Sequence, residues 1–157
     1  MPPKALWKAS QLDLSRAPMG TFRYASLAFA QRNLPPEVVE VIERMAEGLT
    51  APRVTYRFLP LKKGEATGNL DWHCDGQQKA TEIHRLLCIG TEDTEGHDRI
   101  LERGFVWEYD GSYLHRPAPT EKEETTRLLL RVSQTEMLTR NFWQEPPTPQ
   151  QPNPRVT

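Results

Sequence analysis

Between positions 53 and 134, short runs of β-type residues alternate with turn residues at close spacing. The runs that we expect to form strands are 53–59, 70–75, 82–89, 105–109, 112–115 and 127–134. Asp110-Gly111 separates two of these runs, and this dipeptide is typical of a tight hairpin. Several short strands with turn signals between them predict a β-sandwich or a barrel.

One helix is expected to flank this β-rich region, at 35–48. Its start is marked by Pro35-Pro36, because the missing N–H of proline costs nothing in the first turn, and Gly48 provides a stop. Apolar residues at helical spacing form one stripe: Val38, Val41, Ile42, Met45 and Leu49. Upstream, 21–24 reads as a strand, and 26–30 either continues it or begins a short helix. The expected fold is mainly β with a flanking helix.

The length of 157 residues suits one domain, which we place at 1–145. The remainder, 146–157, is rich in proline and is expected to be extended or disordered. No apolar run approaches the roughly 20 residues that span a bilayer, and no apolar signal core follows the first residues. We therefore expect a cytoplasmic protein without a membrane segment. Two cysteines, Cys74 and Cys88, do not make a disulfide framework and are expected to be reduced.

The formal net charge of -1 gives no overall attraction to nucleic acid or to an anionic membrane. Four basic residues nevertheless lie close together in the sequence: Arg53, Arg57, Lys62 and Lys63. They could contact phosphates, but a solvated strand edge is the default interpretation.

The first candidate metal ligands lie in the tripeptide His73-Cys74-Asp75. Side chains alternate faces along a strand, so His73 and Asp75 would point the same way and could take adjacent positions on one metal ion. Cys74 would then point away from that ion. A hydrogen-bonded surface pair of His73 and Asp75 is the alternative.

A second histidine ligand must come from elsewhere in the chain. The candidates are His84, inside an apolar run, and His115, at the end of one. We prefer His115, because a ligand at a strand end can reach the mouth of a barrel, whereas His84 suits a packed position. Two histidines and one carboxylate form the facial triad of non-heme iron(II) oxygenases, which leaves coordination positions open.

The last run, 127–134, supplies a cation. Leu128, Leu130 and Val132 would form one face of this strand, and Arg127, Leu129, Arg131 and Ser133 the other. A buried arginine needs an anionic partner, and its guanidinium suits a bidentate grip on a carboxylate. Arg131 with Ser133 is therefore a candidate carboxylate socket. Pairing of Arg131 with Glu124 or Glu136 on an exposed face is the alternative.

The order His73-x-Asp75, His115, Arg131-x-Ser133 resembles the 2-oxoglutarate- and iron(II)-dependent oxygenase superfamily over about residues 53–136. The resemblance implies a double-stranded β-helix, that is, a jelly-roll or cupin-like barrel. It implies that His73, Asp75 and His115 bind Fe(II), and that Arg131 with Ser133 binds 2-oxoglutarate. Tyr56 is a looser candidate for a hydrogen bond to this cosubstrate. The interval from His115 to Arg131 is long compared with the plant-type members, so Arg127 is a competing cosubstrate ligand.

The implied activity couples decarboxylation of 2-oxoglutarate by O2 to hydroxylation of a substrate. A nucleobase, an amino acid, a peptide side chain and a small metabolite all fit the sequence as that substrate. Two other functions stay open. One is a cupin-like metal protein that does not use 2-oxoglutarate, and the other is a non-enzymatic interaction domain on a degenerate oxygenase scaffold.

Overall fold

The computed structural model describes residues 2–146 of the chain. The predicted tail 146–157 therefore lies, apart from Pro146, outside the described residues. The elements in chain order are β1 (Lys4–Lys8), β2 (Gly20–Ser26), α1 (Leu27–Asn33), α2 (Pro36–Ala46), β3 (Arg53–Lys62), β4 (Ile83–Ile89), β5 (Thr94–Gly96), β6 (Ile100–Leu101), β7 (Phe105–Asp110), β8 (His115–Pro117) and β9 (Glu124–Gln134). The prediction of a mainly β chain with a flanking helix is confirmed.

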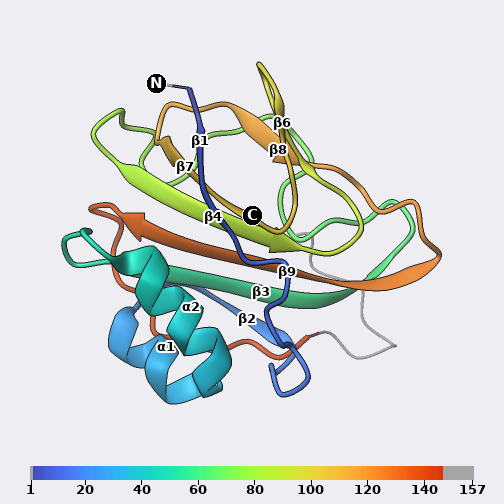
Figure 1. Ribbon diagram of the computed structural model, residues 1–157, viewed down its shortest axis with the longest axis horizontal. Coiled ribbons are helices and arrows are strands. Elements are labelled where there is room, and N and C mark those ends of the chain that lie inside the picture. Colours follow the sequence, from blue (N-terminus) through green and yellow to red (C-terminus); the bar gives the residue numbers. More distant parts are fainter. Residues whose placement is uncertain (1, 147–157) are drawn as a thin grey trace.

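The strands form two antiparallel sheets. The large sheet has the order β1-β7-β4-β9-β3-β2, and the small sheet has the order β6-β5-β8. In Figure 1 the labelled strands of the small sheet lie on one side of the large sheet, and the two helices lie on the other. No helix within residues 2–146 is long and apolar enough to cross a membrane.

The predicted helix 35–48 corresponds to α2, whose Val38, Ile42 and Met45 are buried. The shorter helix α1 begins where Ser26 caps the amide of Phe29. Both helices cover the large sheet, and the main core fills the space between them. On the sheet side this core contains Phe22, Val54, Tyr56, Phe58, Leu87, Val106, Leu128, Leu130 and Val132.

Strand alternation gives the large sheet a second, polar face. In β9 the core takes Leu128, Leu130 and Val132, whereas Leu129 and Arg131 line a cavity on the opposite face. The two faces predicted for this strand are therefore confirmed. The neighbouring strand β3 follows the same rule and turns Thr55 and Arg57 toward the cavity.

Three local predictions are wrong. The run 70–75 is not a strand, since only His73 makes an isolated bridge. The hairpin across Asp110-Gly111 does not form, because β7 pairs with β1 and β4 whereas β8 pairs with β5 in the other sheet. The Asp110 carboxylate instead accepts hydrogen bonds from the backbone and side chain of Ser112, in a turn that leads the chain out of the large sheet. Of the predicted strand 112–115, only His115 belongs to a strand, β8.

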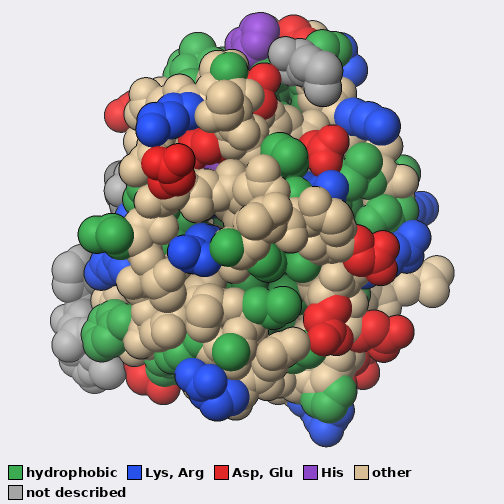
Figure 2. Space-filling view, turned by 90° about the vertical axis from the view of Figure 1, so that its left-hand side faces the viewer, with side chains coloured by type: hydrophobic (Ala, Val, Ile, Leu, Met, Phe, Trp, Pro, Cys, Tyr) green, Lys and Arg blue, Asp and Glu red, His purple; other side chains and the backbone are tan. Residues whose placement is uncertain are grey.

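The prediction that Arg57 lies on a solvated strand edge is also wrong. Its strand was expected to be a solvated edge, but β3 lies inside the large sheet between β2 and β9, and Arg57 is only 5% exposed. On the molecular face drawn in Figure 2, acidic and basic side chains are interspersed, without a broad area of one sign. That mixture agrees with the net charge of -1.

Candidate metal centre

The two candidate histidines meet through their backbones. His73 and His115 form an isolated antiparallel bridge in which each amide donates to the carbonyl of the other residue, both at 2.9 Å. Residues directly opposite each other in such a pair project their side chains to the same side. The ring centroids consequently lie 4.7 Å apart. This bridge, rather than a regular strand, places His73 at the centre.

Both imidazole rings are held from behind by main-chain carbonyls. Nδ1 of His73 lies 2.7 Å from the carbonyl oxygen of Asp71, and Nδ1 of His115 lies 3.0 Å from that of Tyr113. A carbonyl only accepts, so Nδ1 carries the proton in each ring and donates. Each Nε2 is therefore the ring nitrogen that faces the Asp75 carboxylate and is available to a metal ion. Rings oriented in this way are typical of histidine metal ligands.

Asp75 supplies the third ligand atom. His115 Nε2 lies 3.1 Å from Asp75 Oδ2, and His73 Nε2 lies 3.8 Å from Oδ1. One donor atom from each of the three residues falls within 4.8 Å of the others. A first-row divalent metal with bonds of about 2.1 Å places neighbouring ligand atoms about 3 Å apart, so the set fits after a small inward movement of His73.

A second layer of side chains holds the Asp75 carboxylate. Arg131 Nη1 lies 3.1 Å from Oδ1, and the Tyr109 hydroxyl donates to Oδ2 at 2.5 Å. Arg131 also donates to the Tyr24 hydroxyl at 3.1 Å, and this hydroxyl in turn accepts from the amide of Gly76 at 2.9 Å. Both oxygens of the carboxylate are therefore held by partners other than the histidines, as is common for metal-binding carboxylates.

The electrostatics favour an ionised Asp75 and a neutral His73, whereas at His115 they favour a proton that a metal ion would displace. Burial raises the pKa of Asp75, but the charges of Arg131 and His115 outweigh burial and hold it well below its usual value. Burial is the main cause that lowers the pKa of His73. For His115 burial also lowers the pKa, but the charge and hydrogen bond of Asp75 outweigh it, so the pKa is raised. An ionised carboxylate thus faces two imidazoles in a buried site.

A cavity of about 350 Å³ opens beside the three ligands. Its walls come from both sheets and include Leu86 and Leu129 from the large sheet and Thr94 and Pro117 from the small sheet. Cys74 also lines it, but it is not part of the cluster of ligand atoms. A larger groove of about 810 Å³ lies between Trp7 and α2, but its lining contains no histidine or cysteine.

Comparisons of the chain with models of protein families, with curated proteins and with solved structures give no match.

Of the four residues predicted to bind the cosubstrate, only Arg131 lies at the cavity. Ser133 is fully buried, and its hydroxyl pairs with Nδ1 of His84 at 2.8 Å. Arg127 is closed off by an ion pair with Glu92 at 2.5 Å and a hydrogen bond to Ala118.

Tyr56, the fourth of these residues, lies on the opposite face of the large sheet. Its hydroxyl donates to the carbonyl of Pro18 at 2.6 Å, and its ring stacks on Phe22 in the main core. Strand alternation explains this placement, since Tyr56 stands between Thr55 and Arg57, which face the cavity.

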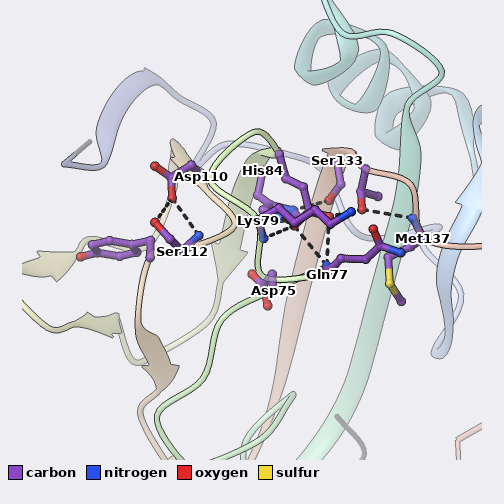
Figure 3. Close-up of polar contacts among 12 residues, drawn as sticks. Asp75, Gln77, Lys79, His84, Asp110, Ser112, Ser133 and Met137 are labelled. Carbon is purple, nitrogen blue, oxygen red and sulfur yellow. Dashed lines mark hydrogen bonds and ion pairs between the residues drawn. The ribbon is translucent and has the colours of Figure 1, made fainter.

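One structural residue close to the centre, Glu82, was not recognised from the sequence. Glu82 is buried, and its carboxylate accepts hydrogen bonds from the amides of Gln77 and Lys79 and from the hydroxyl of Thr135. Figure 3 shows the loop that begins at Asp75 passing through Gln77 and Lys79, near His84. Glu82 therefore fixes the segment that carries the carboxylate ligand. An acidic residue at the start of an apolar run was the only available signal.

Proposed function

We propose that this protein is a non-heme iron(II) oxygenase that couples decarboxylation of 2-oxoglutarate to hydroxylation of a substrate. The observation that carries the proposal is the arrangement of His73, Asp75 and His115. The Nε2 atoms of two histidines and one ionised carboxylate converge beside a cavity, and other groups of the chain hold each ligand in place. This donor set suits a facial triad with positions left for other ligands.

The path of the chain supports a double-stranded β-helix as the topology. From β3 onward, the chain crosses repeatedly between the two sheets: it runs from β3 and β4 in the large sheet to β5 and β6 in the small sheet, and then to β7 (large), β8 (small) and β9 (large). The His73 bridge falls between β3 and β4 and pairs with the first residue of β8. Alternation of this kind is what a two-sheet jelly roll requires.

In the proposed reaction, 2-oxoglutarate, O2 and a substrate C–H bond give succinate, CO2 and the hydroxylated product. Bound iron(II) would supply the activation of oxygen. The chain itself holds the ligand geometry: Arg131 and Tyr109 keep the Asp75 carboxylate ionised and oriented, and carbonyl contacts keep both imidazoles with Nε2 toward the site. The apolar parts of the cavity wall, Leu86 and Leu129, limit access of water.

A second candidate is a cupin-like metal protein that does not use 2-oxoglutarate. The observation that favours it is the engagement of both expected cosubstrate cations. Arg131 is paired with Asp75, and Arg127 is paired with Glu92. Both guanidinium groups are therefore already paired with carboxylates of the protein, whereas the sequence pattern predicted an arginine available to the cosubstrate.

Anaerobic titration of metal-free protein with iron(II), with and without 2-oxoglutarate, separates the candidates. We expect the visible charge-transfer band of a keto acid chelated to iron, and its loss in His73→Ala and His115→Ala. His97→Ala is the matched control, because His97 is outside the ligand cluster. Metal binding without the band would favour the cupin-like candidate. Absence of both would reject a metal function and leave the interaction domain.

A further inference from the structure

Arg57 is a buried cation without an acidic partner. It lies on the cavity face of β3 and is 5% exposed. Its Nε donates to the carbonyl oxygen of Thr67 at 2.5 Å. Within residues 2–146 it makes no ion pair, and the two terminal nitrogens of the guanidinium donate no hydrogen bond to the protein.

Three of the other four arginines on the inner strands of the large sheet pair with an acid. Arg85 pairs with Glu108 at 2.9 Å, Arg127 with Glu92 and Arg131 with Asp75. The fourth, Arg53, has no ion pair within the described residues either, but it is only partly buried and lies outside the cavity lining. Burial, followed by the charges of Arg23 and Arg131, lowers the pKa of Arg57 to about 10. A buried charge left uncompensated in this way is costly for the fold. Folding alone therefore does not account for an arginine at this position.

A second orphaned group stands beside Arg57. Thr67 is 1% exposed, and its hydroxyl has no hydrogen-bond partner within the described part of the chain. The same residue accepts the Arg57 hydrogen bond through its carbonyl and lines the same cavity. Buried hydroxyls are normally paired. The cavity thus presents guanidinium N–H groups and a hydroxyl that both lack a protein partner.

The charge of the cavity points to the kind of ligand. Its lining contains three arginines, Arg23, Arg57 and Arg131, against a single carboxylate, that of Asp75. We infer that Arg57 and Thr67 form a subsite for an anionic group, a carboxylate or a phosphate, on the ligand that occupies the cavity. Guanidinium and hydroxyl groups together suit the oxygens of such a group.

The subsite stands on the geometry of Arg57 and Thr67 and needs no metal. Its assignment to the far carboxylate of 2-oxoglutarate rests on the proposed function, whereas an acidic group of the hydroxylated substrate would use the same chemistry. One experiment can distinguish the cosubstrate from the substrate as the origin of the anionic group, because a dicarboxylate and a phosphate can be offered separately.

The test is calorimetric titration of metal-free, full-length protein with glutarate, with inorganic phosphate and with the neutral analogue glutaramide. We expect glutarate or phosphate to bind and glutaramide not to bind. Arg57→Gln should weaken the binding at least tenfold, and Thr67→Val, which preserves shape, should weaken it several-fold. Arg53→Gln is the matched control on the same strand, since Arg53 does not line the cavity.

Preference for glutarate would assign the subsite to the keto acid, and preference for phosphate would assign it to the substrate. The inference is overturned if neither anion binds wild-type protein, or if folded Arg57→Gln and Thr67→Val both bind like wild type. Because Arg57→Gln removes an unpaired charge, its melting temperature should equal or exceed that of wild type. Glutarate binding without an iron band would reject the oxygenase and keep the subsite.

Discussion

At the scale of single residues, Asp75 receives contacts from four other side chains. His73 and Arg131 face its Oδ1, and His115 and Tyr109 face its Oδ2. All four partners come from different segments of the chain. The carboxylate therefore links the two histidines to the large sheet even before any metal chemistry is considered.

Asp75→Asn should weaken binding of Mn(II), an oxygen-stable probe, at least 100-fold. The amide keeps the shape of the side chain but loses the charge that a divalent metal requires. Arg131 is left buried without its counter-charge, so the free energy of unfolding should fall by about 3 kcal/mol. Calorimetry and urea unfolding measure the two effects. Unchanged metal affinity would exclude Asp75 as a ligand.

His84 should make stability depend on pH. Burial is the main cause that lowers its folded-state pKa to about 4, whereas an unfolded histidine titrates near 6.5. Between these values the unfolded chain binds a proton that the folded chain does not, so stability is complete above about pH 6.5 and falls as pH decreases. From pH 7.5 to 5.0 this loss amounts to about 2 kcal/mol.

Urea unfolding of wild type and His84→Gln at both pH values measures this share of the pH dependence. The variant should lose less stability than wild type between the two pH values, because its amide does not titrate. Identical pH dependence in both proteins would contradict the prediction.

Candidate metal-binding residues could be predicted where a short sequence motif contains them. His73, Asp75 and His115 were predicted from residue type and order, and the structure brings their donor atoms together. The alternation assumed for His73 and Asp75 was wrong, because a single bridge replaces the strand. Arg57 was not recognised, because its burial depends on β3 lying between two other strands, which no local pattern reveals. Ser133 was placed on the correct face of β9, but it is occupied by His84, a long-range contact.

At the scale of elements, Glu82 anchors the loop that follows Asp75. Glu82→Ala removes the acceptor of two amides and one hydroxyl. We expect a loss of about 3 kcal/mol in the free energy of unfolding and faster hydrogen exchange at the amides of Gln77 and Lys79. Glu123→Ala, at an 87% exposed side chain, is the control and should change neither. Protected amides in the Glu82 variant would show that the loop is held by other contacts.

The Arg127–Glu92 ion pair joins β9 to the loop before β5. The two side chains are 3% and 15% exposed, and Glu92 also accepts from the amide of Glu121. Glu92→Gln should cost about 3 kcal/mol, since it leaves a buried guanidinium unpaired. The double variant Glu92→Gln/Arg127→Met should recover much of that loss in chemical unfolding. Additive losses would mean that the two residues are not coupled.

The existence of most strands could be predicted, but not their partners. Alternation and turn residues identified β3, β4, β7 and β9, because these strands bury one face against the helices. The segments of the small sheet are only two or three residues long. Runs this short carry too little periodicity to be recognised, and Asp110-Gly111 joins two sheets where the local signal favoured a hairpin.

At the scale of the whole molecule, the candidate metal centre lies where the two sheets approach each other. His115 belongs to β8 of the small sheet, and the Asp75 carboxylate contacts Tyr109 and Arg131 of the large sheet. A bound ion would hold both sheets at once. Its binding should therefore be visible as a change in global stability.

Mn(II) or Zn(II) at 100 times its dissociation constant should raise the free energy of unfolding by about 2.7 kcal/mol. The melting temperature should rise accordingly in differential scanning fluorimetry, and excess chelator should reverse the rise. His115→Ala should show no shift, whereas His97→Ala should shift like wild type. A shift that persists in His115→Ala would place the stabilising ion elsewhere.

The backbone bridge between His73 and His115 has an evolutionary consequence. The spacing of the two imidazoles depends on a pair of amides and carbonyls, not on the length of the segments between them. Insertions in the loop before Thr94, which lines the cavity, could therefore reshape its wall while the spacing of these two imidazoles stays the same. A lineage built on this scaffold can therefore change which ligands the cavity admits while the two histidines keep their spacing.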